Sequence, residues 1–244
     1  REHWQAWQDH VPGRLVKGAD GYKDFLTIIQ TEGALPSITV HNLRDGSSHT
    51  IAFDEDAYSL GLHGSEEWDT TETRFGYESP STPSQVYDYD MASQTRTLIK
   101  TQEVPSGHSA DDYVVHRIMA PSHDGVDVPV TVMHHRDTPL DGTAPLYLYA
   151  YGSYGMSMPA SFSIKRLSLA DRGVVTATAH IRGGADMGYG WYLDGKMERK
   201  TNTFHDFIGA RDALVQRGWV DPARVGAEGG SAGGMLMGAI ANMA

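Results

Sequence analysis

Cysteine is absent from this chain of 244 residues, which excludes disulfides, thiolate metal sites and a cysteine nucleophile. Long apolar runs are absent as well: none approaches the roughly 18 residues that a membrane-spanning helix needs, and no signal peptide is recognisable. Basic residues are few, 20 against 31 acidic ones, and the net charge of −11 argues against nucleic acid as a partner. We therefore expect a cytoplasmic protein that binds neither nucleic acid nor membranes.

Histidine is plentiful, with 12 residues, yet its spacing does not predict a metal site. His116, His123 and the pair His134-His135 have no acidic or histidine partner at ligand spacing on one predicted element. We expect neither a metal nor another cofactor.

Residues 1–106 show the pattern of an all-β region, in which short alternating runs are separated by turn signals. The unit Ser37–Ile51 resembles the unit Ser84–Ile99 at an offset of roughly 47 residues, near the period of a propeller blade. A propeller needs at least about four blades, and about two are present. We predict that this region forms the C-terminal blades of a larger propeller. The predicted strands are Phe25–Gln30, Ile38–Leu43, Thr50–Phe53, Arg74–Glu78, Gln85–Tyr89 and Thr97–Thr101, and the aromatic residues expected in the blade core are Trp4, Trp7, Tyr87 and Tyr89.

Residues 107–244 alternate strands with helices, which is typical of a sheet with crossover helices. Asn202 or Thr203 is expected to cap the long helix, and the stretch around Trp191 is expected to be a loop. The element order is that of an α/β-hydrolase up to its nucleophile. The predicted strands are His116–Ala120, Val128–His135, Pro145–Tyr151, Val174–Ala179 and Arg224–Glu228, and the predicted helices are Phe162–Ala170, Thr203–Arg217 and Ala232–Met243.

A glycine-dense corner between the last strand and the last helix carries one serine, and Gly229, Ser231 and Gly233 fit the pattern G-x-S-x-G. A serine on such a turn is strained, so the residues two positions before and after it must lack side chains for the turn to close. Its hydroxyl lies at the N-terminus of a helix, where backbone dipoles favour developing negative charge. A phosphate loop and a dinucleotide fingerprint fit poorly, because Met235 replaces the Walker lysine and Ser231 the second glycine. We hypothesise that Ser231 is a nucleophile; the alternative is a turn that only serves packing.

Acyl transfer at Ser231 also needs oxyanion donors and a base. The candidate donors are the backbone N–H of Ala232 and the hydroxyl of Tyr151, although Tyr151 at a strand end is equally explained by packing under a loop. No base can be nominated, because only 13 residues follow Ser231 and none is acidic or histidine. Upstream, His180 is expected to shape a turn and His205 to face solvent.

Six stretches, in order, resemble the prolyl oligopeptidase family (peptidase family S9), and within it the oligopeptidase B branch. They are Tyr151–Gly155, Arg166–Gly173, His180–Gly184, Trp191–Lys196, Asn202–Phe207 and Gly229–Gly238. The upstream half is similar as well, at Ile51–Asp54, Arg74–Tyr77 and Tyr87–Met91. The likeness therefore covers nearly the whole chain.

The resemblance implies a seven-bladed propeller joined to an α/β-hydrolase domain that hydrolyses short peptides through an acyl-enzyme on Ser231. Tyr151 and the Ala232 N–H would form the oxyanion hole, and the oligopeptidase B branch cuts after Lys or Arg, so short basic peptides are the expected substrates. The triad Asp and His would lie beyond Ala244, so the 244 residues alone are expected to be inactive. An esterase or acylaminoacyl-type hydrolase of this fold, and a non-catalytic hydrolase fragment, stay open as alternatives.

One departure from the family concerns a neighbouring subsite. Some members carry acidic residues just after the Tyr-Gly-Ser-Tyr-Gly turn, and these help to bind a second basic side chain. The corresponding stretch here, Ser157–Phe162, holds no acidic residue. The sequence therefore does not support a preference for a second basic residue there.

Overall fold

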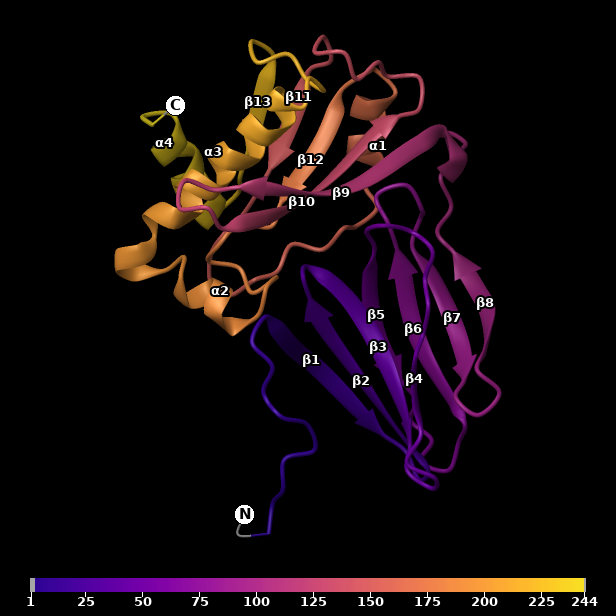
Figure 1. The fold of residues 1–244 in the computed structure, drawn as a ribbon. Helices are drawn as coiled ribbons and strands as arrows, with labels where there is room; N and C mark the ends of the chain where they lie inside the picture. Colours follow the sequence, from indigo (N-terminus) through magenta and orange to yellow (C-terminus); the bar gives the residue numbers. More distant parts are fainter. Residues whose placement is uncertain (1–2, 244) are drawn as a thin grey trace.

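A computed structural model describes residues 3–243 and shows two parts (Figure 1). The N-terminal part consists of two four-stranded antiparallel sheets, and the C-terminal part is a five-stranded mixed sheet covered by helices. The fold predicted from the sequence, propeller blades followed by the first part of an α/β-hydrolase, is confirmed. The predicted boundary between residues 106 and 107 falls in the connection between the last blade strand and the first short helix, and stays a prediction.

The two sheets are propeller blades in which each strand pairs with the next. The first contains β1 (Arg14–Gly21), β2 (Phe25–Glu32), β3 (Leu35–Asn42) and β4 (Ser48–Thr50), and the second β5 (Ser59–Gly64), β6 (Glu72–Glu78), β7 (Gln85–Asp90) and β8 (Thr95–Thr101). The repeat seen in the sequence corresponds to the third and fourth strands of each blade. The first strand of each blade, β1 or β5, was not predicted, because glycines and a bulge interrupt its alternation. The strand predicted at Thr50–Phe53 is wrong beyond Thr50.

The two blades share one hydrophobic core between their facing sheets. Ile38 of the first blade and Phe75 of the second are completely buried in it, and Tyr89 is also buried there. The expectation that Trp4 and Trp7 belong to this core is wrong: they precede β1 and are 81% and 60% exposed. The prediction of blade-core residues is therefore confirmed for those that lie on a strand.

The five-stranded sheet of the C-terminal part has the strand order β13-β11-β12-β10-β9. β9 and β10 form an antiparallel pair, β10 is antiparallel to β12, and β11 is parallel to both β12 and β13. Its elements are η1 (Ala110–Asp112), β9 (Tyr113–Pro121), β10 (Asp127–His135), β11 (Leu146–Tyr149), α1 (Ile164–Ala170), β12 (Val175–Ala179), α2 (Tyr189–Leu193), η2 (Met197–Arg199), α3 (Thr201–Gln216), β13 (Val225–Glu228) and α4 (Ala232–Ile240).

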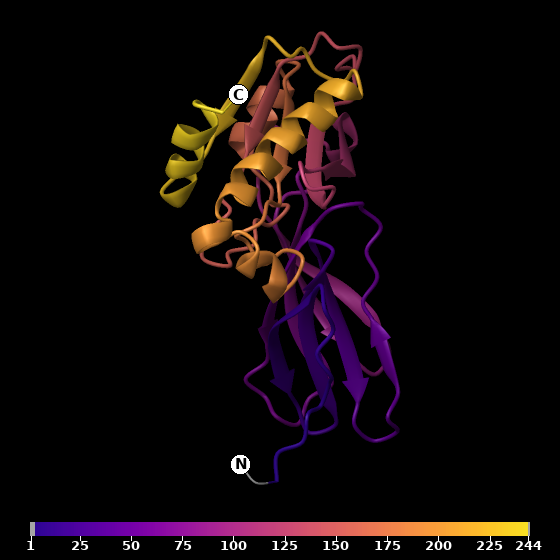
Figure 2. The same ribbon diagram turned by 60° about the vertical axis from the view of Figure 1, so that its left-hand side comes forward.

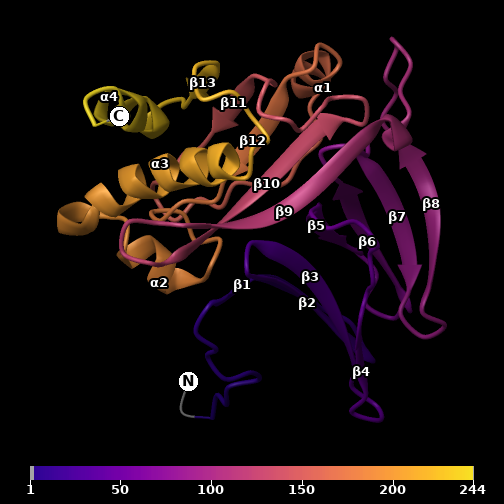
Figure 3. The same cartoon turned by 45° about the horizontal axis from the view of Figure 1, so that its top comes forward.

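Helices cover both faces of this sheet. Successive residues of a strand point to opposite faces, and in β10 Val132 packs in the core that contains α3, whereas Met133 packs with Leu167 of α1. α4 adds Leu236 to the α3 side and contacts α3 directly, as Figures 2 and 3 show. Within residues 3–243, no helix combines the length and the apolar character needed to cross a membrane.

Two local expectations in the connection before α3 are wrong. The stretch around Trp191 is the short helix α2, not a loop. Lys200 is the N-cap of α3, and no side chain caps the helix. The Asn202 amide donates to the Asp194 carbonyl, and the Thr203 hydroxyl donates to the carbonyls of Gly195 and Arg182, which precede the helix. The residues expected as caps therefore tie the helix to the loop before it.

Candidate active site

Three turns follow the three parallel strands of the sheet. Because parallel strands end at the same edge, the turns Tyr151–Gly155 after β11, His180–Gly184 after β12 and Gly229–Gly233 after β13 lie along one edge. This edge faces the blades at β12, where the N–H of Ala34, in the β2–β3 turn, donates to the carbonyl of Asp186 at 2.9 Å. The candidate site is therefore assembled from separate segments by the strand order.

The turn at Ser231 is strained and exposed. Ser231 has φ 54° and ψ −118°, a left-handed conformation that costs a non-glycine residue about 1–3 kcal/mol. A Cβ added at Gly229 would lie 2.4 Å from the Gly233 carbonyl oxygen, so the turn closes only with glycine there. The N–H groups of Gly233 and Gly234 bond to the carbonyls of Gly230 and Ser231, which starts α4 directly after the serine.

Close packing of α4 on the end of β11 places Tyr151 beside the first turn of α4, which directly follows Ser231. A Cβ added at Gly233 would meet the Ala150 carbonyl oxygen at 3.1 Å and the Tyr151 ring at 3.7 Å, so glycine permits this approach. Ala232 is the first residue of α4, and such N–H groups lack an acceptor inside the helix. The structure thus gathers Ser231, Ala232 and Tyr151, whose catalytic roles stay predictions.

Lys200 holds the turn that follows Tyr151, a role that the sequence did not reveal. Its ammonium donates to the Gly152 carbonyl and to the Ser153 hydroxyl, the latter at 2.9 Å. Gly152 has φ 68°, and a Cβ there would lie 2.4 Å from a methyl group of Thr203. Burial lowers the pKa of the Lys200 ammonium. Nothing in the local sequence marks this lysine, since its partners lie 47 and 48 residues upstream.

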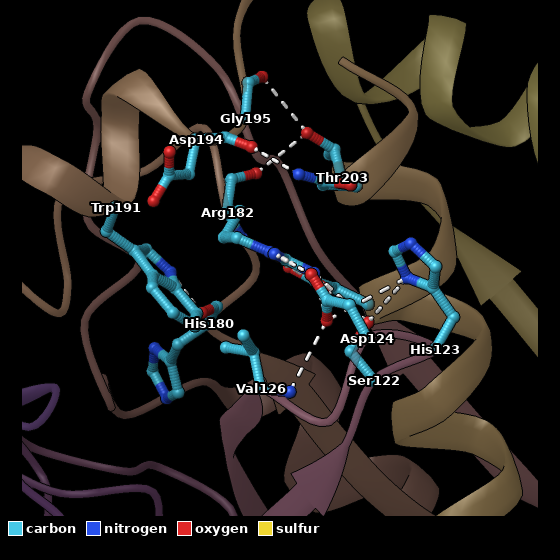
Figure 4. Close-up of polar contacts among 12 residues, drawn as sticks. Ser122, His123, Asp124, Val126, His180, Arg182, Trp191, Asp194, Gly195 and Thr203 are labelled. Atoms are coloured by element: carbon cyan, nitrogen blue, oxygen red, sulfur yellow. Dashed lines mark hydrogen bonds and ion pairs between the residues drawn. The ribbon is translucent and has the colours of Figure 1, made fainter. Parts of the chain in front are cut away.

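Arg182 is the centre of a buried ionic cluster beside this turn (Figure 4). Its guanidinium donates to Asp206 at 2.6 Å and 2.9 Å, to Asp124 at 2.6 Å and to the Ser122 hydroxyl at 3.2 Å. The Arg182 side chain is 4% exposed and that of Asp206 is fully buried. Trp191 lies against the guanidinium, with 5.9 Å from its carbon to the ring centre. The cluster fixes the turn after β12 to α3 and to the β9–β10 turn.

Charge pairing dominates the electrostatics of this cluster. Burial alone would lower the pKa of the Arg182 guanidinium, but hydrogen bonds to Asp206 and Asp124 outweigh burial and raise it. The hydrogen bond from Arg182 lowers the pKa of the Asp124 carboxyl to about 2, against an ordinary value of 3.8. Arg182 and Asp124 are therefore charged at neutral pH, and the hydrogen bonds of Arg182 to Asp124 and Asp206 hold this edge of the sheet.

The two histidines considered from the sequence bond elsewhere than Ser231. His180 is 2% exposed and bonds to the Thr131 hydroxyl at 2.8 Å and to Asp186 at 3.2 Å, consistent with the expected role in a turn. The expectation that His205 faces solvent is wrong: it is half-buried and packs on His123 with 4.2 Å between ring centres. In the described range 3–243, no group of three His, Asp or Glu side chains is placed to hold a metal ion.

Comparisons with known proteins agree with this geometry. Residues 1–102 match the family described as "Prolyl oligopeptidase, N-terminal beta-propeller domain", and residues 160–244 match the "Prolyl oligopeptidase family". The chain belongs to the prolyl oligopeptidase family. Among the curated members of this family, it is 46% identical to "Dipeptidyl aminopeptidase BI" of Pseudoxanthomonas mexicana and 37% identical to "Protease 2" of Moraxella lacunata. These alignments cover 100% and 91% of the chain, but 34% and 32% of the relatives.

Solved structures of this family have the same fold as the chain. Oligopeptidase B from Leishmania major superposes with a TM-score of 0.88 at 34% identity, covering 96% of the chain and 34% of that structure. Oligopeptidase B from Trypanosoma brucei, with covalently bound antipain, gives 0.89 at 32% identity with the same coverage. The chain thus spans about a third of the length of the relatives it matches.

Proposed function

We propose that the whole protein is a serine oligopeptidase that cleaves short peptides after Lys or Arg, with Ser231 as its nucleophile. The observation that carries the proposal is the strained, exposed position of Ser231 at the start of α4, with Tyr151 alongside. Strain of this kind is maintained where the exposed side chain is used. Membership of a family of serine peptidases supports it.

In the proposed reaction, the Ser231 hydroxyl oxygen attacks the scissile carbonyl carbon and its proton passes to a general base. The carbonyl oxygen becomes an oxyanion, which accepts hydrogen bonds from the Ala232 N–H and the Tyr151 hydroxyl. The base then protonates the leaving amine as the C–N bond breaks, and water hydrolyses the acyl-enzyme by the reverse route. α4 contributes its N-terminal dipole at the point where the negative charge develops.

The preference for Lys or Arg is supported by the similarity to two proteins named oligopeptidase B and by the net charge of −11, which attracts cationic peptides over distance. The relative named dipeptidyl aminopeptidase suggests a second mode, release of dipeptides from a free N-terminus. A coumarin amide of an Xaa-Arg dipeptide with a free N-terminus, compared with the same compound acylated, separates the two. Preference for the acylated compound favours the oligopeptidase mode.

The 244 residues alone are proposed to be inactive, because they supply no identified general base. The buried histidines His180 and His134 bond to groups other than Ser231. His180 is committed to Thr131 and Asp186, and His134 is committed to His116 at 3.1 Å. Oxyanion donors without a base leave only residual rate enhancement. Turnover of an arginyl coumarin amide by the purified 244-residue chain would overturn this part of the proposal.

The central test is Ser231→Ala in the full-length protein, assayed on an arginyl coumarin amide. We expect kcat to fall by about 10⁶-fold, as loss of a triad serine does elsewhere. Ser163→Ala is the matched control, because Ser163 precedes α1 and its side chain caps nothing. Retained activity in Ser231→Ala would remove Ser231 as nucleophile. A kcat/KM higher for acyl esters lacking arginine than for the arginyl amide would favour the esterase alternative.

A further inference from the structure

The turn that follows β11 has a strained backbone. Gly152 and Gly155 have φ 68° and 67°, and Tyr154 between them has φ 59°. This left-handed conformation persists in a residue with a side chain only where the surrounding structure enforces it. Tyr151 comes directly before the turn, and in the proposed function its hydroxyl donates to the oxyanion. The direction of the Tyr151 side chain is therefore tied to the contacts that hold the turn.

Two contacts with neighbouring segments hold this turn, one near each end. At the far end, the Gly155 N–H donates to the Gly183 carbonyl at 2.9 Å. At the near end, the Lys200 ammonium donates to the Gly152 carbonyl and, at 2.9 Å, to the hydroxyl of the buried Ser153. The Gly152 residue is next to Tyr151 in the chain, so Lys200 acts one residue away from the candidate oxyanion donor.

Lys200 is poorly placed to serve the helix that it precedes. It is the N-cap of α3, where the helix dipole disfavours a positive charge. Its side chain is half-buried, and burial lowers the pKa of the ammonium because the charged form loses solvation. A lysine that served only α3 would extend its charge into water. The contact with the turn after β11 therefore accounts for the position of the Lys200 ammonium.

Catalysis by an oxyanion donor is sensitive to small displacements. The donor must lie about 2.7–3.1 Å from the oxygen on which negative charge develops, and a displacement of about 1 Å can lower the rate about 100-fold. A strained turn relaxes when a contact that enforces it is removed. Loss of the Lys200 contact should therefore slow the chemical step more than it weakens substrate binding.

We propose that Lys200 is a positioning residue for the oxyanion site: its ammonium, bonded to Gly152 and Ser153, holds the turn that directs the Tyr151 hydroxyl. The inference rests on the proposed function, because it takes Ser231 as the nucleophile and Tyr151 as an oxyanion donor. Since Lys200 acts through Tyr151, its effect appears in kcat and disappears when the Tyr151 hydroxyl is absent.

The test is a double-mutant cycle in the full-length protein, assayed on an arginyl coumarin amide. Tyr151→Phe should lower kcat by about 100-fold, as removal of one oxyanion donor does. Lys200→Met removes both hydrogen bonds and keeps an unbranched side chain, and it should lower kcat about tenfold with KM changed less than about twofold. Added to Tyr151→Phe, it should lower kcat less than about twofold further, because the hydroxyl that Lys200 positions is gone.

Losses that multiply to about 1,000-fold in the double variant would contradict the proposal, because Lys200 would then act independently of Tyr151. An unchanged kcat in Lys200→Met, or in Tyr151→Phe, would contradict it as well. Far-UV circular dichroism checks that each variant is folded. If Lys200→Met does not fold, Ser153→Ala decides, since it removes one acceptor and keeps the lysine. We expect it to lower kcat about threefold, and a loss that persists beside Tyr151→Phe rules the proposal out.

Arg224→Met is the matched control. The Arg224 guanidinium also donates to a distant backbone carbonyl, that of Thr143 at 3.2 Å. Arg224 precedes β13, however, and so lies at the opposite edge of the sheet from Ser231. Its kcat should stay within about twofold of the wild type. A loss as large as that of Lys200→Met would mean that any loosening of the sheet slows the reaction, and the role assigned to Lys200 would be wrong.

Inhibitor binding separates this inference from the proposed function. When an acylated arginine aldehyde binds, the serine oxygen bonds to the aldehyde carbon, the serine proton passes to the general base, and the aldehyde oxygen becomes the oxyanion. The corresponding alcohol cannot form this bond. Lys200→Met should raise the Ki of the aldehyde about tenfold and leave the Ki of the alcohol unchanged.

Equal rises in Ki for the aldehyde and the alcohol would overturn the positioning role even if the wild type cleaves arginyl amides normally. An aldehyde that binds the wild type no more tightly than the alcohol would overturn the proposed function, and this inference with it. A selective loss of aldehyde binding in Lys200→Met supports both.

Discussion

Two turns at the same edge of the sheet are built in opposite ways. The turn after β12 carries Arg182, and the turn after β13 carries Ser231; both follow a parallel strand and both are flanked by glycines. Arg182 is 3% exposed and bonds to two carboxylates and a hydroxyl. Ser231 is exposed, in a left-handed conformation, at the first turn of a helix.

The difference shows how rigidity and reactivity are divided along this edge. Burying a guanidinium is tolerable only when its charge is fully paired, so the Arg182 turn has its polar groups satisfied and becomes a fixed anchor. A nucleophile needs the reverse, an accessible hydroxyl near donors that stay free for the substrate.

The largest expected effect comes from breaking the anchored turn. Arg182→Met should lower the free energy of unfolding by about 3–5 kcal/mol, because it leaves the fully buried Asp206 carboxylate without its cation. Chemical denaturation of the full-length protein measures the loss, with far-UV circular dichroism as the check on folding.

Arg199→Met is the matched control for that experiment. Arg199 also pairs with an aspartate, Asp194, but the two side chains are 68% and 45% exposed. Exposed pairs contribute at most about 1 kcal/mol, so this variant should remain within that margin of the wild type. A loss for Arg182→Met as small as that for Arg199→Met would mean that the buried cluster is not an anchor.

The strained turn provides the next largest effect, which is measured on activity. Gly229→Ala places a methyl group 2.4 Å from the Gly233 carbonyl oxygen, whereas a Cβ at Gly230 meets nothing within 4 Å. We expect Gly229→Ala to lower kcat/KM on an arginyl amide about 100-fold through displacement of Ser231, and Gly230→Ala to lower it by less than about threefold. Similar losses of kcat/KM in both variants would show that the close contact at Gly229 does not position Ser231.

The sequence predicted most of the five-stranded sheet of the C-terminal part because its strands are apolar and its glycine motifs mark the turns. It failed where strands are irregular: β1 and β5 contain glycines and bulges that hide the alternation. It also placed Trp4 and Trp7 in the blade core, although they precede β1 and lie on the surface. Alternation of apolar and polar residues predicts which face of a strand a residue lies on, but it predicts nothing for residues outside strands.

The site was predictable only in part, for a physical reason. Ser231 and Ala232 share one local motif, and Tyr151 ends an apolar strand, so each left a trace in the sequence. The partners of Arg182 did not, since Asp206 and Asp124 lie 24 and 58 residues away and are brought in by α3 and the β9–β10 turn. The Lys200 contact with Gly152, 48 residues upstream, is of the same kind. Side-chain pairs fixed by tertiary packing leave no local pattern to read.

The smallest expected effect is the acid dependence that the Arg182 cluster gives to stability. Arg182 lowers the pKa of Asp124 in the folded state to about 2, below the ordinary 3.8. A carboxyl with a lowered folded pKa stabilises the fold above its unfolded pKa, and that stabilisation is lost as pH falls from about 4 toward 2. Asp124→Asn lacks this stabilisation, so the free energies of unfolding of wild type and variant should differ by about 1 kcal/mol at pH 5 and converge near pH 2. The difference is this small because Asp124 is 34% exposed and solvent screens its charge. Urea denaturation across this range measures the convergence, and a constant difference at every pH would show that the pair contributes through packing and not through charge.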